Sequence, residues 1–154
     1  MPKKRKQQQG MVDVSPKKMT RRRAVACAEV VLGEKAFEAL TGEGSPKGDV
    51  LESAKLAGVL AAKSTPTLIP YCHPLALNKV AIRFQMNKKE ASVVVSAEVV
   101  CNGRTGVEME AMTAASVSAL TIYDMMKWAD KGIAIGKVEL IEKSGGRSGH
   151  YKRA

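Results

Sequence analysis

The stretch from Thr105 to Lys127 has the composition of one long helix and carries charged side chains at both of its ends. At about 3.6 residues per turn, Glu110, Asp124 and Lys127 fall on one face of that helix among mostly apolar neighbours. Charged groups on a largely buried helix lower stability unless they are paired or hydrogen-bonded. This face is therefore either a structural ion network or the wall of a pocket, and the helix alone leaves both interpretations open.

The two ends of this helix are too far apart to serve one small-molecule site within a single chain. Glu110 and Asp124 are separated by roughly 21 Å along a helix axis, at about 1.5 Å per residue. If both ends act on one ligand, we expect the second end to come from another subunit.

Three loops place cationic or titratable side chains beside residues that constrain the backbone. Lys47 precedes Asp49 at an expected helix start, where free amide groups and the helix dipole favour an anion. His73 lies between two prolines and can act as an acid, a base or an anion donor near neutral pH. The segment 143–149 offers two cations and a glycine-rich backbone to phosphate oxygens. Taken singly, Lys47 is more often a solvated loop lysine and His73 more often a core histidine, while a disordered terminal loop is an equal alternative for 143–149.

Together, the helix and the loops supply several cations, one histidine and a few carboxylates. The cations are Lys47, Lys127, Lys143 and Arg147, and the carboxylates are Glu108, Glu110 and Asp124. Cations neutralise a polyphosphate, and a lysine beside an aspartate can have its pKa shifted enough to transfer protons. The implied substrate is a small phosphorylated metabolite.

Length and composition predict one domain with a hydrophobic core. The chain has 154 residues, of which 45% are hydrophobic, and it contains no uncharged apolar run long enough to cross a membrane. Its formal net charge of +10 comes mostly from the first 23 residues, and the remainder is nearly balanced. Residues 1–10 are expected to be a disordered basic tail and residues 11–154 a single domain. With no secretory signal, the expected compartment is the cytoplasm.

The cysteines predict neither a disulfide framework nor a zinc site. Cys27, Cys72 and Cys101 are odd in number and lack the C-x-x-C spacing, so we expect buried free thiols. With only two histidines in the chain, a histidine-rich metal site is excluded as well.

The elements that must position these residues follow the order strand, helix, strand, strand, helix, strand. Strands are expected at 23–32, 80–86, 93–99 and 133–142, and helices at 34–40, 49–63 and 105–127. Pro66 and Pro70 are expected to exclude regular helix from 65 to 74, and a bulge is expected near Gly136. The order predicts an α+β, ferredoxin-like domain: a four-stranded antiparallel sheet with two main helices on one face.

Five motifs resemble the MoaC family of cyclic pyranopterin monophosphate synthases in molybdenum-cofactor biosynthesis. They are KGDV at 47–50, LIPYCHPL at 68–75, TGVEMEAMTAA at 105–115, LTIYDM at 120–125 and KSGGRSG at 143–149. The resemblance extends from about Met11 to the C-terminal loop, and it identifies 11–154 as a single MoaC-like catalytic domain. It implies a lyase that converts 3′,8-cyclo-7,8-dihydro-GTP to cyclic pyranopterin monophosphate with release of pyrophosphate.

The resemblance also implies roles for individual residues. Lys47 and Lys127 would be the acid/base lysines, with Asp124 as their partner. If each pocket draws on two chains, the inactive variants Lys47→Ala and Lys127→Ala are expected to complement each other in mixed oligomers. The substrate-binding residues would be Arg22, Cys72, His73, Leu75, Glu108, Met109, Glu110, Lys143 and Arg147. Among these, the cationic residues Arg22, Lys143 and Arg147 would hold the triphosphate.

The resemblance further implies an assembly and a place in a reaction sequence. Family members are hexamers, trimers of dimers with sites between subunits, and they act after a radical SAM GTP cyclase. We expect no required cofactor, no protein-bound metal and no membrane association. A magnesium ion could accompany the substrate triphosphate.

Two other classes of function compete with this enzyme. A basic nucleic-acid-binding module would fit the pI of about 9.7 and the ferredoxin-like order, but the chain has only two Phe, three Tyr and one Trp for base stacking. A regulatory sensor of the same fold would bind a phosphorylated ligand without turning it over. Turnover of the cyclised nucleotide separates the enzyme from both.

Overall fold

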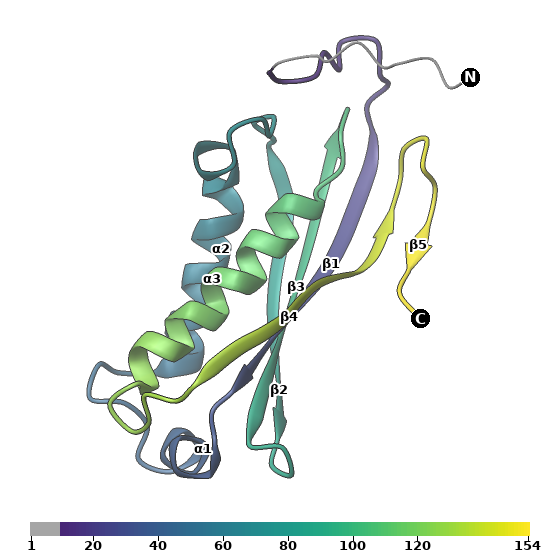
Figure 1. Cartoon of the computed structure of the whole chain (residues 1–154). Helices are drawn as coiled ribbons and strands as arrows, with labels where there is room; N and C mark the ends of the chain where they lie inside the picture. The colour runs from purple at the N-terminus through teal and green to yellow at the C-terminus, as the bar shows by residue number, and fades with distance from the viewer. Residues whose placement is uncertain (1–9) are drawn as a thin grey trace.

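The computed structural model describes residues 10–154. Its elements are β1 (Thr20–Val31), α1 (Glu34–Thr41), α2 (Val50–Leu68), β2 (Leu77–Asn87), β3 (Ser92–Gly103), α3 (Glu108–Met126), β4 (Ala134–Ser144) and β5 (Tyr151–Lys152). The strands form one antiparallel sheet in the order β2-β3-β1-β4-β5, and α2 and α3 cover one face of it (Figure 1). The α+β class is confirmed.

The predicted number of four strands is wrong, because a short fifth strand follows the glycine-rich loop. In β5 the chain turns back along β4, so that Tyr151 lies opposite Lys143 and Lys152 opposite Glu142. A strand of two residues has no alternation of apolar and polar positions, so the sequence carried no periodic signal for it. Its effect is to hold both ends of the loop at the edge of the sheet.

Small side chains in the central strand allow α3 to pack closely on the sheet. In β1 the inward positions Ala24, Ala26, Ala28 and Val30 are fully buried. The helix meets them with further alanines, namely Ala111, Ala114, Ala115 and Ala119, which are also fully buried. Close packing of this kind fixes α3 rigidly, and both ends of α3 carry candidate site residues.

The predicted bulge in the last strand is confirmed. Between β1 and β4 the register passes from Cys27 opposite Glu139 to Glu29 opposite Gly136, so β4 contains one residue more than its partner there. Lys137 has a positive φ of 49° at this point. A second shift, between Val25 and its neighbour, lies closer to the end of β4.

Helix α2 begins as predicted but ends later. The Asp49 side chain accepts a hydrogen bond from the backbone N–H of Glu52 at 3.0 Å, which is the predicted cap. The helix continues to Leu68 with Pro66 inside it, so the prediction that helix stops before 65 is wrong. Pro66 lies in the last turn, where it removes a single backbone donor, and the N–H of Ile69 still bonds to the carbonyl of Thr65 at 2.9 Å.

Three further predictions concern the tail, the thiols and membranes. Apart from Gly10, the predicted tail lies outside the described residues. Cys101 is buried, but Cys27 and Cys72 are partly exposed, so the prediction of buried thiols holds for one of the three. Among the described helices, none combines the length and the apolar character that crossing a bilayer requires.

Candidate functional site

The charged site residues predicted from the sequence gather in two clusters at opposite ends of α3. The lysine cluster consists of Lys47, Asp124 and Lys127, and it lies where α3 ends. The anion cluster consists of Arg22, Glu108, Lys143 and Arg147, and it lies where α3 begins. The rise from Glu108 to Asp124 is roughly 24 Å at about 1.5 Å per residue, so one chain keeps the two clusters apart, as the sequence predicted.

In the lysine cluster, each oxygen of one carboxylate binds a different lysine. Lys47 Nζ lies 2.7 Å from Asp124 Oδ2, and Lys127 Nζ lies 2.9 Å from Asp124 Oδ1. Lys47 comes from the loop between α1 and α2, which is tied to α3 by a hydrogen bond from Ser45 Oγ to the carbonyl of Met125 at 2.7 Å. The two lysines therefore share one partner and belong to the same half of any site.

The ion pairs in this cluster shift pKa values in a direction that matters for proton transfer. Hydrogen bonds from Lys47 and Lys127 lower the pKa of Asp124, and the hydrogen bond to Asp124 raises the pKa of Lys127. Lys127 is therefore an ammonium group at neutral pH. That state suits a proton donor and not a general base.

A cavity of about 480 Å³ opens beside the lysine cluster. Besides the three clustered side chains, it is lined by Pro46, Tyr123, Trp128 and Lys131. The combination of a few charged groups with aromatic and apolar walls is typical of small-molecule sites.

A second cavity, of about 610 Å³, lies at the anion cluster. It is lined by smaller side chains and by five cations and one carboxylate. The cations are Lys17, Lys18, Arg22, Lys143 and Arg147, and the carboxylate is Glu108. The backbone that leads into the N-terminus of α3, at Thr105 and Gly106, completes the wall, and a helix N-terminus also favours an anion. This excess of positive charge fits a polyphosphate.

Arg22 is the buried member of this cluster, and a glycine makes room for it. Arg22 is 8% exposed, and its Nε donates to the carbonyl of Gly103 at 3.1 Å. Gly146 has a φ of 79°, and a Cβ atom there would overlap the guanidinium of Arg22. Within residues 10–154 no carboxylate forms an ion pair with Arg22, and a buried cation without a counter-charge favours the arrival of an anion.

The other charges in the anion cluster are partly compensated. Lys143 Nζ lies 3.1 Å from Glu108 Oε1, and both side chains are about one quarter exposed. Arg147 is exposed on the loop after β4. Sequence analysis missed Lys17 and Lys18, which were counted in the net charge but assigned no role; their position just before β1 was the available signal.

Glu110 lies in the first turn of α3, as Glu108 does, but in a poorly solvated environment. It is 3% exposed, and burial raises its pKa above the usual carboxyl value. Burial also raises the pKa of Cys72 and Cys101, and the nearby charge of Glu110 adds to both shifts. These thiols are consequently protonated at neutral pH and are poor nucleophiles.

The remaining predicted site residues line neither cavity in one protomer. His73 lies in the loop between α2 and β2, and its Nε2 is 2.6 Å from the carbonyl oxygen of Val12. Leu75 packs against the hydrophobic core, and Met109 is 37% exposed at the start of α3. The structure thus brings His73, Leu75 and Met109 to the same end of the molecule as the anion cluster without placing them on its cavity wall.

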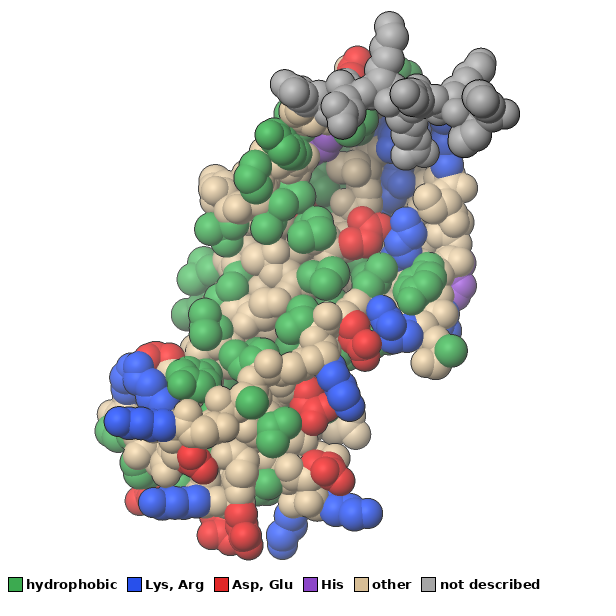
Figure 2. Space-filling model, viewed as in Figure 1, with side chains coloured by type: hydrophobic (Ala, Val, Ile, Leu, Met, Phe, Trp, Pro, Cys, Tyr) green, Lys and Arg blue, Asp and Glu red, His purple; other side chains and the backbone are tan. Residues whose placement is uncertain are grey.

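The surface between the two clusters is largely apolar. Figure 2 shows hydrophobic and uncharged side chains over α2 and α3, with charged side chains gathered toward the lower end and along one side. The large apolar residues exposed on these helices are Leu56, Leu60, Leu68, Met109 and Leu120. Several large apolar side chains exposed on the same two helices make this surface a candidate interaction face.

Comparisons with known proteins agree over nearly the whole chain. The sequence profile of the MoaC family matches residues 11–146. The cyclic pyranopterin monophosphate synthase of Magnetococcus marinus is 51% identical over 143 residues, which cover 93% of this chain and 88% of that protein. The one from Geobacillus thermodenitrificans is 53% identical over 145 residues, covering 93% and 90%. A mitochondrial one from Arabidopsis thaliana is 49% identical over 143 residues, covering 93% of this chain and 53% of its own length.

Proposed function

The chain belongs to the MoaC family, and we propose that it is a lyase that makes cyclic pyranopterin monophosphate for the molybdenum cofactor. Its substrate would be 3′,8-cyclo-7,8-dihydro-GTP, and its second product pyrophosphate. One observation carries this proposal: a chain about half identical to named synthases carries a lysine–aspartate cluster and, separately, a cavity lined by five cations.

In this proposal the lysine cluster performs the acid/base chemistry on the rings. Lys127 starts as an ammonium group because Asp124 raises its pKa, so it is the proton donor when the imidazole ring opens. Lys47 is the second lysine of the same cavity and shares Asp124 with it. Asp124 positions both lysines and is a carboxylate throughout, because the hydrogen bonds from Lys47 and Lys127 lower its pKa.

The anion cluster would hold the triphosphate and stabilise the leaving pyrophosphate. Closing a cyclic phosphate breaks the bond to the pyrophosphate, which leaves with added negative charge. Cations that are already positioned stabilise such charge without reorganisation, and Arg22, Lys143 and Arg147 supply them. Magnesium would accompany the substrate through its phosphate oxygens, and we propose no further cofactor.

We propose that one ligand joins the two clusters across a subunit boundary. The rise of α3 separates the clusters within one chain, and the exposed apolar surface of α2 and α3 offers a face for assembly. A hexamer built as a trimer of dimers would supply such boundaries. The substrate pocket around the anion cluster would then be completed by the other residues that the resemblance names: Cys72, His73, Leu75, Met109 and Glu110.

The finer points of classification are also proposals. We place residues 11–154 in one catalytic domain of ferredoxin-like fold, supported by the strand order β2-β3-β1-β4, to which β5 is an addition. We propose a cytoplasmic enzyme that receives its substrate from a radical SAM GTP cyclase.

The test is turnover of the cyclised nucleotide by the purified full chain. We expect pyrophosphate and cyclic pyranopterin monophosphate to appear in equal amounts. Lys47→Ala and Lys127→Ala should each abolish turnover while the far-UV circular dichroism and the oligomeric state stay unchanged. Tight binding of the nucleotide without any product would instead identify a phosphate-ligand sensor.

A further inference from the structure

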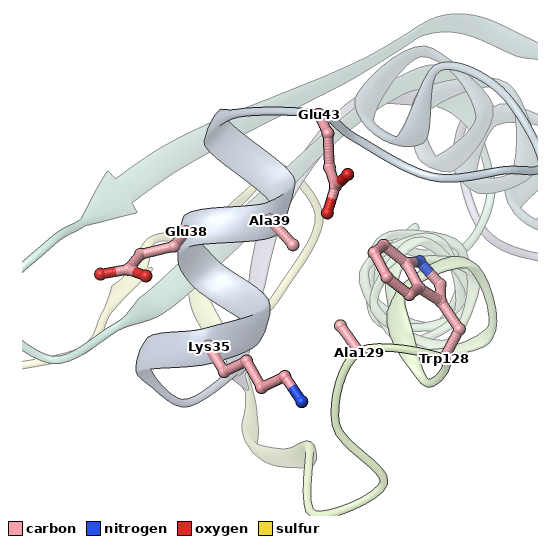
Figure 3. Close-up of a pocket in the computed structure, with 6 residues that line it drawn as sticks. All are labelled: Lys35, Glu38, Ala39, Glu43, Trp128 and Ala129. Carbon is pink, nitrogen blue, oxygen red and sulfur yellow. The ribbon is translucent and has the colours of Figure 1, made fainter.

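Trp128 lies just after α3 and lines two hollows in the surface. One hollow, of about 360 Å³, lies against α1 and is lined by Lys35, Glu38, Ala39, Glu43 and Ala129 as well (Figure 3). The other is the cavity of the lysine cluster. Trp128 therefore lies between the hollow at α1 and the cavity of the lysine cluster.

The exposure of this residue is unusual for its type. Trp128 is the only tryptophan in the chain, and it is 48% exposed in the described protomer. Indole carries a large apolar surface and flat faces that favour packing against another ring. On the α1 side its neighbours include three charged side chains, whereas on the lysine side it continues the apolar wall formed by Pro46 and Tyr123.

We propose that Trp128 is the wall on which the ring system of the cyclised guanine nucleotide packs, with Lys47 and Lys127 at the polar edge of those rings. The inference rests on the proposed function. The acid/base lysines must reach the reacting ring atoms, and the triphosphate is assigned to the distant anion cluster. The rings are therefore the part of the substrate that enters this cavity. An aromatic wall there keeps water from one face of the rings and holds them in register with the lysines.

The proposal predicts a loss of substrate affinity on truncation of the indole. Stacking of a base on an aromatic side chain contributes enough that Trp128→Ala should raise KM by about tenfold. Trp128→Phe keeps a flat ring and should raise KM by about twofold to threefold, while Trp128→Leu keeps only apolar volume and should resemble the alanine variant. Lys35→Ala is the matched control, because Lys35 lines the α1 hollow and not the cavity of the lysine cluster.

A second measurement uses Trp128 itself as the reporter. Because the chain has no other tryptophan, its emission should change when the wild-type enzyme is mixed with the cyclised nucleotide in a stopped-flow instrument. Inorganic triphosphate carries the charge without the rings, so it should compete for the anion cluster and leave the emission unchanged.

The outcomes separate this inference from the proposed function. If the wild type makes product but Trp128→Ala keeps its KM, or Trp128→Leu equals Trp128→Phe, the aromatic wall is overturned and the enzyme assignment stands. An equal emission change with inorganic triphosphate would also overturn the wall. If the wild type makes no product, the proposed function itself fails.

Discussion

The separation of the two clusters predicts which inactive variants can rescue each other. Lys127→Ala damages the lysine cluster, and the double variant Lys143→Ala/Arg147→Ala damages the anion cluster. If every site takes one cluster from each of two protomers, a mixed oligomer contains sites in which both clusters are intact. The sequence had favoured mixing Lys47→Ala with Lys127→Ala, but both lysines bind Asp124 in the same cluster, so that pair should restore nothing.

The expected size of the rescue follows from counting. In an equal mixture, half of the chains supply an intact lysine cluster and half supply an intact anion cluster. Random association therefore gives about one quarter of the sites both intact clusters, and hence about a quarter of the activity of unmodified enzyme. Lys127→Ala alone should be depressed by at least about 100-fold, since loss of a general acid typically lowers the rate by about 10²–10⁴-fold. The double variant should also be strongly depressed, because it lacks two of the three cations assigned to the triphosphate.

The assay is release of pyrophosphate after subunits have exchanged, with exchange verified by native mass spectrometry of chains of different mass. Mixing Lys47→Ala with Lys127→Ala is the matched control and should stay inactive. The reasoning is refuted if the control pair regains a quarter of the activity. It is refuted equally if the opposite-cluster pair regains none once exchange is complete.

Three further predictions follow from single side chains. Asp124→Asn should lower the pKa of Lys127, because the hydrogen bond that raises it is weakened, so the alkaline limb of the kcat/KM profile should move to lower pH; an unmoved limb would show that Lys127 is not the donor. Glu110→Gln should raise the free energy of unfolding at neutral pH by about 1 kcal/mol. Burial raises the pKa of Glu110, so the folded state keeps the carboxyl proton at pH values where the unfolded chain has lost it, and the stability of the wild type falls as pH rises above the ordinary carboxyl value of 4.5. The stability gained by Glu110→Gln should therefore vanish in denaturant titrations below that pH. A gain in stability that persists there would contradict this reason. Thr20→Val should raise stability by up to about 1 kcal/mol, because Thr20 Oγ1 is the buried side-chain polar atom in residues 10–154 that has no hydrogen-bond partner; a loss of stability relative to Thr20→Ser would refute this.

Regular elements were predictable where the local signal is strong. The strands β1 and β3, the helix start at Asp49 and the bulge near Gly136 were predicted correctly to within a few residues, because each depends on a few neighbouring residues. The predicted end of α2 was wrong because the effect of Pro66 depends on where the helix ends. A proline in the last turn removes only one hydrogen bond, so the helix continues past it. A two-residue strand such as β5 depends on tertiary pairing alone.

The candidate site was predictable by residue type but not by arrangement. The sequence analysis named every charged member of both clusters, with Arg22 and Lys127 lying outside the five motifs, yet nothing local in the sequence could show that Lys47 reaches Asp124 across 77 positions of the chain. Lys17 and Lys18 were missed because the sequence of a basic segment does not show which of its lysines line a cavity in the folded chain. The burial of Arg22 depends on the glycine at 146, a contact that only the folded chain reveals.

The central claim is that one nucleotide joins the lysine cluster of one protomer to the anion cluster of another. A crystal structure of the assembled Lys47→Ala variant with bound 3′,8-cyclo-7,8-dihydro-GTP tests it most directly. We expect the rings at hydrogen-bonding distance, about 3 Å, from Lys127 Nζ and the triphosphate on Arg22, Lys143 and Arg147 of the neighbouring protomer. A nucleotide bound entirely by one cluster, or a triphosphate seated on Lys127, would contradict the claim.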